Sequence, residues 1–258
     1  MQKIHISGSE NDRIKQLKKL NQKKFRQKSG MFFIENLKTA HDAAKSGILP
    51  IQIFVTEEFE ERNKKEVDFI LKKSGVKEIY AMSPKVNRKF SNLDTPAGFA
   101  AVYKNLNAVI NLSKPVIYLN AISDPGNLGT MLRSALAFGI DNVVLDEECA
   151  DLYNFKTLSA AKDSFFKLRI EYDHGAKLLK VIKKQMPVYA TKKSGGQSPD
   201  FLRKQKKIAI ILGNESLGVD KNLLKMADGF ITIKTSGRVE SLNVAAAAAI
   251  IFYEIFQS

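Results

Sequence analysis

The sequence predicts an α/β protein with a small N-terminal α/β domain and a larger C-terminal domain built on a parallel sheet. Short apolar runs alternate with stretches of helical periodicity along the chain. The apolar runs of the second half are rich in β-branched residues, as is typical of parallel strands covered on both faces. An asparagine-rich segment, KNLNAVINLSKP at residues 104–115, separates the two halves and is the expected linker.

The N-terminal domain is expected to cover residues 1–106. Leu17, Leu20 and Phe25 fall near helical spacing, so residues 10–27 predict a helix with Asn11 as its N-cap and its lysines outward. Alternating apolar residues then predict strands, and glycine marks the helix ends. The further elements are expected at 31–36 (strand), 37–47 (helix), 50–58 (strand), 61–75 (helix), 77–83 (strand) and 98–104 (apolar closing stretch).

The C-terminal domain is expected to cover residues 107–258. Its strands are predicted from short runs such as VIYLNAI and KIAIILG, and each is followed by a polar or glycine-containing loop. The predicted strands are 116–122, 142–146, 187–191, 207–213 and 230–234, and the predicted helices are 129–139, 175–185 and a final helix from about Leu242.

Charge gives the first indication of a partner. The 258 residues carry 41 Lys/Arg against 27 Asp/Glu, a net charge of +14. The stretch RIKQLKKLNQKKFRQK at 13–28 holds no acidic residue, which favours binding to a phosphate backbone, although a solvated helix face is the alternative. The residues expected to contact RNA phosphates are Lys18, Lys19, Lys23, Lys24 and Arg26.

Few residues are available for common catalytic chemistries. The single cysteine, Cys149, excludes a disulfide framework and favours a reducing cytoplasm. The three histidines are scattered, so no metal site is expected, and no phosphate-binding glycine motif is present. No apolar run reaches 18 residues, so no membrane span is expected. Any chemistry must therefore use carboxylates, amides, hydroxyls and arginine.

Those residue types gather in three loops that follow predicted strands. The loops are SDPGNLGTMLRSALAFG (123–139), GNESLG (213–218) and SGRVESLN (236–243). Each alone has an ordinary interpretation as a turn or a helix cap. Ligands of open parallel sheets bind outside the carboxyl ends of the strands, so together the three loops predict one site.

These three stretches resemble the ordered motifs of the SpoU (TrmH) family of RNA ribose 2'-O-methyltransferases, in the SPOUT superfamily. The resemblance spans about residues 116–256, and residues 4–103 resemble the family's small RNA-recognition domain through SENDRIKQLKKL, RQKSGMFFIEN and TPAGFAAV. The chain departs from the family pattern at Lys234, where proline is usual, at Asn36, where glycine is common, and at Asp163 in a Ser-x-Gly pattern.

The resemblance implies a fold and a cofactor. The C-terminal segment of the family is threaded into a deep trefoil knot whose backbone forms the S-adenosylmethionine pocket. The small residues 245–249 would let the last helix pass close to neighbouring backbone, and the polar loop before it would line the pocket. A homodimer through the C-terminal domain is implied as well. The residues implied to bind the cofactor are Leu212, Gly213, Asn214, Gly218, Ile233 and Leu242.

The resemblance also implies catalytic roles. Arg133 would contact the ribose 2'-hydroxyl and assist its deprotonation or stabilise the forming alkoxide. Asn127, Ser241 and Asn243 would position the hydroxyl and Arg133, and Glu215 would orient its own loop. The separate N-terminal domain favours 23S ribosomal RNA as the substrate. The alternatives are a tRNA 2'-O-methyltransferase and a non-catalytic RNA-binding assembly factor.

Overall fold

The computed structural model describes residues 2–257 and separates the chain into two compact units. The first is Met1–Leu106 together with Tyr153–Leu158, and the second is Asn107–Leu152 together with Ser159–Ser258. The inclusion of Tyr153–Leu158 in the first unit had no sequence signal. Tyr153 stacks on Phe32 at 4.5 Å between ring centroids, so an aromatic contact holds this segment there.

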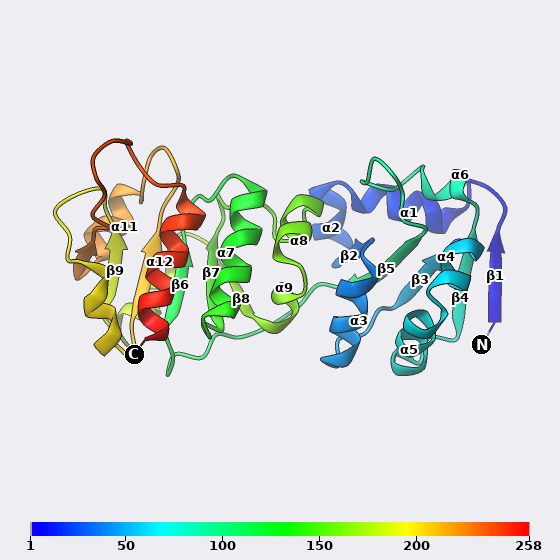
Figure 1. The fold of residues 1–258 in the computed structure, drawn as a ribbon, viewed down its shortest axis with the longest axis horizontal. Coiled ribbons are helices and arrows are strands. Elements are labelled where there is room, and N and C mark those ends of the chain that lie inside the picture. Colours follow the sequence, from blue (N-terminus) through cyan, green and yellow to red (C-terminus); the bar gives the residue numbers. More distant parts are fainter. Residues whose placement is uncertain (1, 258) are drawn as a thin grey trace. The chain divides into compact units, whose positions relative to one another are not determined.

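The first unit is built on a mixed five-stranded sheet with strand order β1-β4-β3-β5-β2 (Figure 1). The β1–β4 and β3–β4 pairs are parallel, whereas β5 pairs antiparallel with both β3 and β2. The sequence did not predict β1. The strands are β1 (Gln2–Ile6), β2 (Met31–Ile34), β3 (Gln52–Val55), β4 (Glu78–Met82) and β5 (Phe99–Lys104).

The helix predicted over residues 10–27 is in fact two helices. Asn21 ends the first with its backbone N–H bonded to the carbonyls of Lys18 and Lys19, and its side-chain amide donates to the Phe90 carbonyl at 2.8 Å. These contacts turn the chain before the second helix begins. The helices of this unit are α1 (Asp12–Leu20), α2 (Lys23–Ser29), α3 (Leu37–Lys45), α4 (Glu57–Arg62), α5 (Lys64–Ser74) and α6 (Pro84–Asn87).

The second unit confirms the predicted parallel sheet. Its six strands have the order β11-β9-β10-β6-β7-β8, and every neighbouring pair is parallel. The sequence did not predict β8, an edge strand in which charged residues interrupt the apolar pattern. The strands are β6 (Val116–Leu119), β7 (Asn142–Asp146), β8 (Arg169–Asp173), β9 (Val188–Thr191), β10 (Ala209–Leu212) and β11 (Gly229–Ile231).

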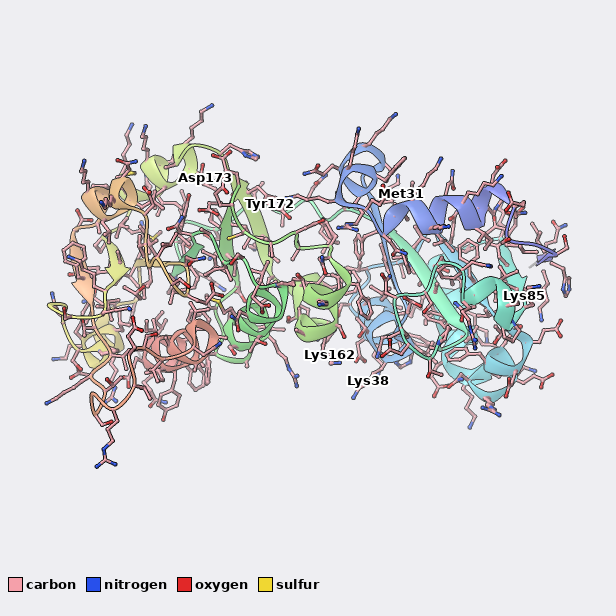
Figure 2. The ribbon with its side chains drawn as sticks, turned by 90° about the horizontal axis from the view of Figure 1, so that it is seen from above. Met31, Lys38, Lys85, Lys162, Tyr172 and Asp173 are labelled. Carbon is pink, nitrogen blue, oxygen red and sulfur yellow. The ribbon has the colours of Figure 1, made fainter. Side chains whose placement is uncertain are left out.

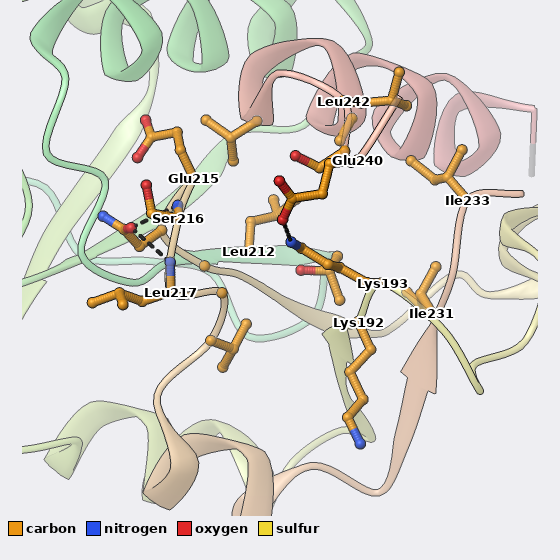
Figure 3. A pocket seen from close by; sticks show the side chains of 18 of the residues that line it. Lys192, Lys193, Leu212, Glu215, Ser216, Leu217, Ile231, Ile233, Glu240 and Leu242 are labelled. Atoms are coloured by element: carbon orange, nitrogen blue, oxygen red, sulfur yellow. Dashed lines mark hydrogen bonds and ion pairs between the residues drawn. The ribbon is translucent and has the colours of Figure 1, made fainter. Parts of the chain in front are cut away.

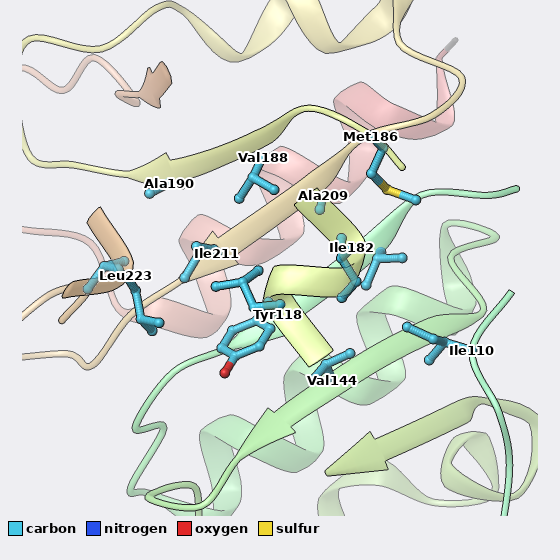
Figure 4. Packing of buried hydrophobic residues seen from close by; sticks show 13 residues of the cluster. Ile110, Tyr118, Val144, Ile182, Met186, Val188, Ala190, Ala209, Ile211 and Leu223 are labelled. Carbon is cyan, nitrogen blue, oxygen red and sulfur yellow. The ribbon is translucent and has the colours of Figure 1, made fainter. Parts of the chain in front are cut away.

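Helices cover both faces of this sheet, which explains its continuous apolar strands. On one face, Tyr118, Val144 and Ile211 pack with Ile182 of α10 and Leu223 of α11 (Figure 4). α7 and α12 pack together on the other face (Figure 1). The helices of this unit are α7 (Pro125–Ala137), α9 (Ser164–Lys167), α10 (Lys177–Lys183), a 3₁₀ turn η1 (Pro199–Lys204), α11 (Lys221–Met226) and α12 (Val244–Phe256). The helix α8 (Phe155–Ala161) belongs to both units, because its residues up to Leu158 lie in the first. No helix within residues 2–257 is long and apolar enough to cross a membrane.

The alanine-rich helix α12 begins at Val244, two residues later than predicted. Asn243 is its N-cap, and its side-chain oxygen accepts from the backbone N–H groups of Ala245 and Ala246. Ala245 and Ala248 are buried, because α12 packs against α7 and η1. A small residue at these positions lets the helix backbone come close to its neighbours.

Candidate active site

The carboxyl ends of β6 and β7 are held together by one carboxylate. Asp146, the last residue of β7, accepts from the Asn120 side-chain amide at 2.5 Å and from the Ala121 backbone N–H at 3.0 Å. Ala121 has a positive φ of 53°. The Asn120 side-chain oxygen also accepts from the Asp220 N–H at 2.8 Å. These bonds fix the strand ends on which the polar loops are mounted.

A chain of side-chain hydrogen bonds connects the three predicted motif loops. The Asn127 amide donates to Glu215 Oε1 at 2.8 Å, and the Asn243 amide donates to Asn127 Oδ1 at 3.1 Å. Asp124 caps α7 by accepting from the Asn127 backbone N–H at 2.7 Å. Because residues far apart in sequence meet here, the structure brings Asn127, Glu215 and Asn243 into one site.

The loop that carries Glu215 is closed by its own backbone. Asn214 and Gly218 exchange both backbone hydrogen bonds, and Asn214 Oδ1 accepts from the N–H groups of Ser216 and Leu217. A Cβ at Gly213 would lie 2.3 Å from the Gly218 carbonyl carbon and the Val219 nitrogen, so only glycine fits. Gly218 has a φ of +72°, which glycine adopts without strain.

A cavity of about 350 Å³ lies beside this loop (Figure 3). It is walled by the loops after β9, β10 and β11 and by the start of α12. All six residues implied to bind the cofactor line it, and so do Glu215 and Ser241. The lining residues that sequence reasoning missed include the polar side chains of Thr191, Lys193, Thr235 and Glu240.

An ion pair joins two of the loops at the cavity. Lys193 Nζ lies 2.7 Å from Glu240 Oε1. Figure 3 marks this contact with a dashed line. The hydrogen bond from Lys193 and its positive charge lower the pKa of the Glu240 carboxyl. Both side chains are exposed, and such a pair has no signature in a single sequence.

Arg133 lies elsewhere on the same helix as Asn127. It is exposed and is not one of the residues that line the cavity. The pKa of Asp163 is lowered overall. Burial raises this pKa, but the hydrogen bond from Lys167 and the positive charges of Lys167 and Arg133 lower it by more. Asp163, a departure from the family pattern, therefore stands within electrostatic range of Arg133.

The thiol of the single cysteine is buried and is not available for chemistry at this site. Burial, together with the charge of Asp146, raises the pKa of the Cys149 thiol, whose sulfur donates to the Leu119 carbonyl. This cysteine is therefore no candidate nucleophile. Within residues 2–257 no three His, Cys, Asp or Glu side chains are grouped so as to hold a metal ion.

The structure corrects one of the five residues expected to bind RNA. Arg26 is 5% exposed, and its guanidinium donates to the Leu20 carbonyl at 2.7 Å. The prediction that it contacts phosphate was wrong, because the break at Asn21 turns this side chain inward onto the end of α1. Lys18, Lys19, Lys23 and Lys24 are exposed.

Comparison with known proteins identifies the family. The family model "SpoU rRNA Methylase family" matches residues 114–253, and the model of an MRM3-like substrate binding domain matches residues 11–101. The 23S rRNA (guanosine(2553)-2'-O)-methyltransferase RlmP of Bacillus subtilis is 33% identical over 251 residues, which cover 97% of this chain and 98% of the relative.

Solved structures share the fold over nearly the whole chain. An AdoMet-bound rRNA methyltransferase from Sinorhizobium meliloti has a TM-score of 0.86 at 24% identity, covering 99% of this chain and 98% of that one. The AdoMet complex of the SpoU methyltransferase AviRb from Streptomyces viridochromogenes has a TM-score of 0.83 at 20% identity, covering 96% and 97%. The chain belongs to the SpoU rRNA methylase family, and it is an RNA methyltransferase that uses S-adenosylmethionine.

Proposed function

We propose that the protein methylates the ribose 2'-hydroxyl of one nucleotide in 23S ribosomal RNA. The observation that supports this proposal most strongly is the hydrogen-bonded chain Glu215–Asn127–Asn243, which joins three loops beside a cavity of about 350 Å³. Support for the ribosomal substrate comes from RlmP, which matches this chain over both units. The match to a substrate binding domain over residues 11–101 favours ribosomal RNA over tRNA as the substrate.

The cavity suits S-adenosylmethionine. Its volume falls within the range of small-molecule pockets, roughly 300–1,000 Å³. Leu212, Ile233 and Leu242 would supply apolar wall for the cofactor, and the close backbone of Gly213 and Gly218 would supply polar groups to hold it. When bound, the cofactor supplies an electrophilic methyl group on a sulfonium.

The side chains around the cavity would prepare the nucleophile. A ribose hydroxyl is a poor nucleophile at neutral pH and needs a fixed position and help with its proton. Asn127 is fixed on both sides, since it donates to Glu215 and accepts from Asn243. Asn127, Ser241 and Asn243 would orient the hydroxyl, and Arg133 would hold the developing alkoxide through its planar set of donors.

We infer that the enzyme is a homodimer formed through the second unit. Ile250, Tyr253 and Phe256 repeat every three residues on α12 and are 40%, 46% and 58% exposed. Phe138, after α7, stacks edge-on with Tyr253 at 5.8 Å. An exposed apolar face of this kind is suited to a two-fold interface. Because Arg133 lies on α7, this dimer would place it next to the interface.

Two further expectations belong to this proposal. The trefoil knot stays a prediction, and it fits a last segment in which the loop before α12 and the helix itself line the cavity. Action in the cytoplasm fits a chain whose single cysteine is a buried thiol.

The first unit is proposed to bind RNA through Lys18, Lys19, Lys23 and Lys24. Replacing all four by glutamine should weaken RNA binding and lower its salt dependence by roughly 0.7 per lost phosphate contact on single strands. The matched control replaces the exposed Lys64, Lys65, Lys72 and Lys77. Affinity for S-adenosylmethionine should survive both changes, and equal losses of RNA affinity in the two variants would contradict the assignment.

The substrate is tested by mapping 2'-O-methylation in ribosomal RNA and tRNA from strains with and without the gene. One 23S nucleotide should lose its methyl group in the deletion strain, and purified enzyme should restore it in vitro. A lost methyl group in tRNA would replace the ribosomal assignment. RNA without any lost methyl group, combined with intact RNA binding, would favour an assembly factor.

A further inference from the structure

The first unit contains a second cavity that the methyl-transfer site does not use. It measures about 320 Å³ and lies between α1, α2 and the strands β2, β3 and β5. Leu17, Leu20 and Val102 form a buried apolar floor. Met31, labelled in Figure 2, adds a half-buried side chain where α2 passes into β2. The volume is near the lower end of small-molecule pockets.

The break between α1 and α2 creates this cavity. Phe25, Lys28 and Ser29 lie on one face of α2 and line the cavity together with Gln16 and the apolar residues of α1. A single helix over 10–27 could not turn the same residues onto its own earlier turns. The Asn21 contacts that end α1 therefore also shape this pocket.

The rim of the cavity is cationic and aromatic. Lys19 and Lys28 are exposed, and Lys19 Nζ lies 5.4 Å from the centroid of the half-buried Phe25 ring. The side-chain amides of Gln16 and Gln52 also line the cavity and make no hydrogen bond within residues 2–257. An amide offers both donors and an acceptor, which match the edge of a nucleobase.

We propose that this cavity receives one unpaired nucleobase of the RNA substrate. The apolar floor and the Phe25 ring would contact the faces of the base, as aromatic side chains do in proteins that bind single-stranded RNA. Gln16 and Gln52 would bond its edge, and Lys19 and Lys28 would hold the adjoining phosphates. The inference rests on the proposed function, since it assumes an RNA substrate, and it adds a second point of recognition remote in sequence from the methyl-transfer motifs.

The positive charge around the cavity distinguishes a nucleobase from an apolar protein side chain as its occupant. An apolar pocket alone would suit an apolar side chain of a protein partner. Cations at the rim, with further lysines at 18, 23 and 24, suit a flat apolar group attached to an anionic backbone. A nucleotide in a single strand is such a group.

The test uses the full-length protein and two probes, a short single-stranded oligoadenylate and the same ribose-phosphate backbone without bases. Phe25→Ala should weaken binding of the oligoadenylate by about 5-fold to 100-fold and leave the abasic probe unaffected. The salt dependence should not change, because no charge is removed. Phe25→Leu keeps apolar volume for folding and should show the same selective loss.

Charge variants complete the test. Lys28→Gln should weaken both probes and lower the salt dependence, whereas Lys72→Gln, on α5, should leave both unchanged. Thermal melting and S-adenosylmethionine affinity are measured for every variant, and Phe25→Leu must retain both. Equal losses on the two probes, or no loss on either, would overturn the base pocket.

The outcomes separate this inference from the proposed function. A wild-type protein that binds both probes equally, yet methylates 23S RNA, has no base pocket and keeps its proposed function. A protein with base-selective binding at Phe25 that leaves 23S RNA unmethylated keeps the pocket and loses the proposed substrate.

Discussion

Gly213 and Gly218 begin and end the loop 213–218, and each position requires glycine for a different physical reason. A Cβ at Gly213 would collide with the backbone of Gly218 and Val219, whereas a Cβ at Gly218 would meet no atom within 4 Å. Gly218 instead needs its left-handed conformation, at φ +72°. The loop holds Asn214 and Glu215 at the cavity, so its closure decides whether the site forms.

We therefore expect unequal effects of alanine at these positions. Gly213→Ala should open the loop and abolish S-adenosylmethionine binding. Gly218→Ala should cost about 1 kcal/mol of stability from the left-handed backbone and retain measurable binding. Calorimetric titration with cofactor and thermal melting give both quantities, and Gly47→Ala in the first unit is the matched control at positive φ. Equal cofactor affinities for the Gly213 and Gly218 variants would contradict this account.

The sequence predicted the location of a single side chain well where that side chain follows the end of a parallel strand. Asn127 and Glu215 follow parallel strands, and such strands end at the same edge of a sheet, so their meeting could be predicted. Arg26 could not be separated from the neighbouring lysines, because its burial depends on a helix break that Asn21 sets through the distant Phe90 carbonyl. Lys193 and Glu240 pair across two loops without any local pattern.

At the scale of elements, the ion pair Lys193–Glu240 ties the loop after β9 to the loop before α12. Lys193 lowers the pKa of Glu240 in the folded protein. A lowered carboxyl pKa means that this contact is complete above the ordinary glutamate pKa and is lost as pH falls through the folded value. The pair therefore helps to hold the two loops together at neutral pH.

Glu240→Gln should raise the Kd for S-adenosylmethionine at neutral pH by less than about tenfold, because exposed ion pairs contribute little. The difference between wild type and variant should shrink in high salt and as pH is lowered below the ordinary carboxyl range. Titration calorimetry across pH and salt measures it, with Glu148→Gln as an exposed control. A difference that persists at acid pH would show that charge is not the cause.

Elements were predicted best where apolar runs are continuous. The strands β6, β7, β9 and β10 overlap their predicted runs because both sheet faces are buried. β8 was missed because this edge strand alternates charged and apolar residues, with Arg169 and Tyr172 exposed. The helix over 10–27 was predicted as continuous because Asn21, which ends α1, is tolerated inside helices at a small cost and its contact with Phe90 is distant in sequence.

At the scale of the whole molecule, the apolar face of α12 predicts the oligomeric state. Phe256→Asp should convert a dimer into a monomer of 28.8 kDa, because it places a charge on the most exposed residue of the proposed apolar interface. Light scattering after size exclusion measures the mass. Val181→Asp, on α10 at 48% exposure, is the control and should remain dimeric. A monomeric wild-type protein would contradict the proposed dimer.

Three loops of the second unit meet in one site, and we propose that cofactor binding and activation of the nucleophile are separate tasks of different residues there. Single-turnover transfer of labelled methyl to 23S RNA from a deletion strain, with cofactor affinity measured in parallel, tests it most directly. Arg133→Ala should keep its S-adenosylmethionine affinity while transfer falls by about 10²–10⁴-fold. Arg133→Lys should recover little of it, and Arg169→Ala should behave as wild type. An Arg133→Ala enzyme with wild-type transfer, or with cofactor affinity lost in proportion, would contradict the account.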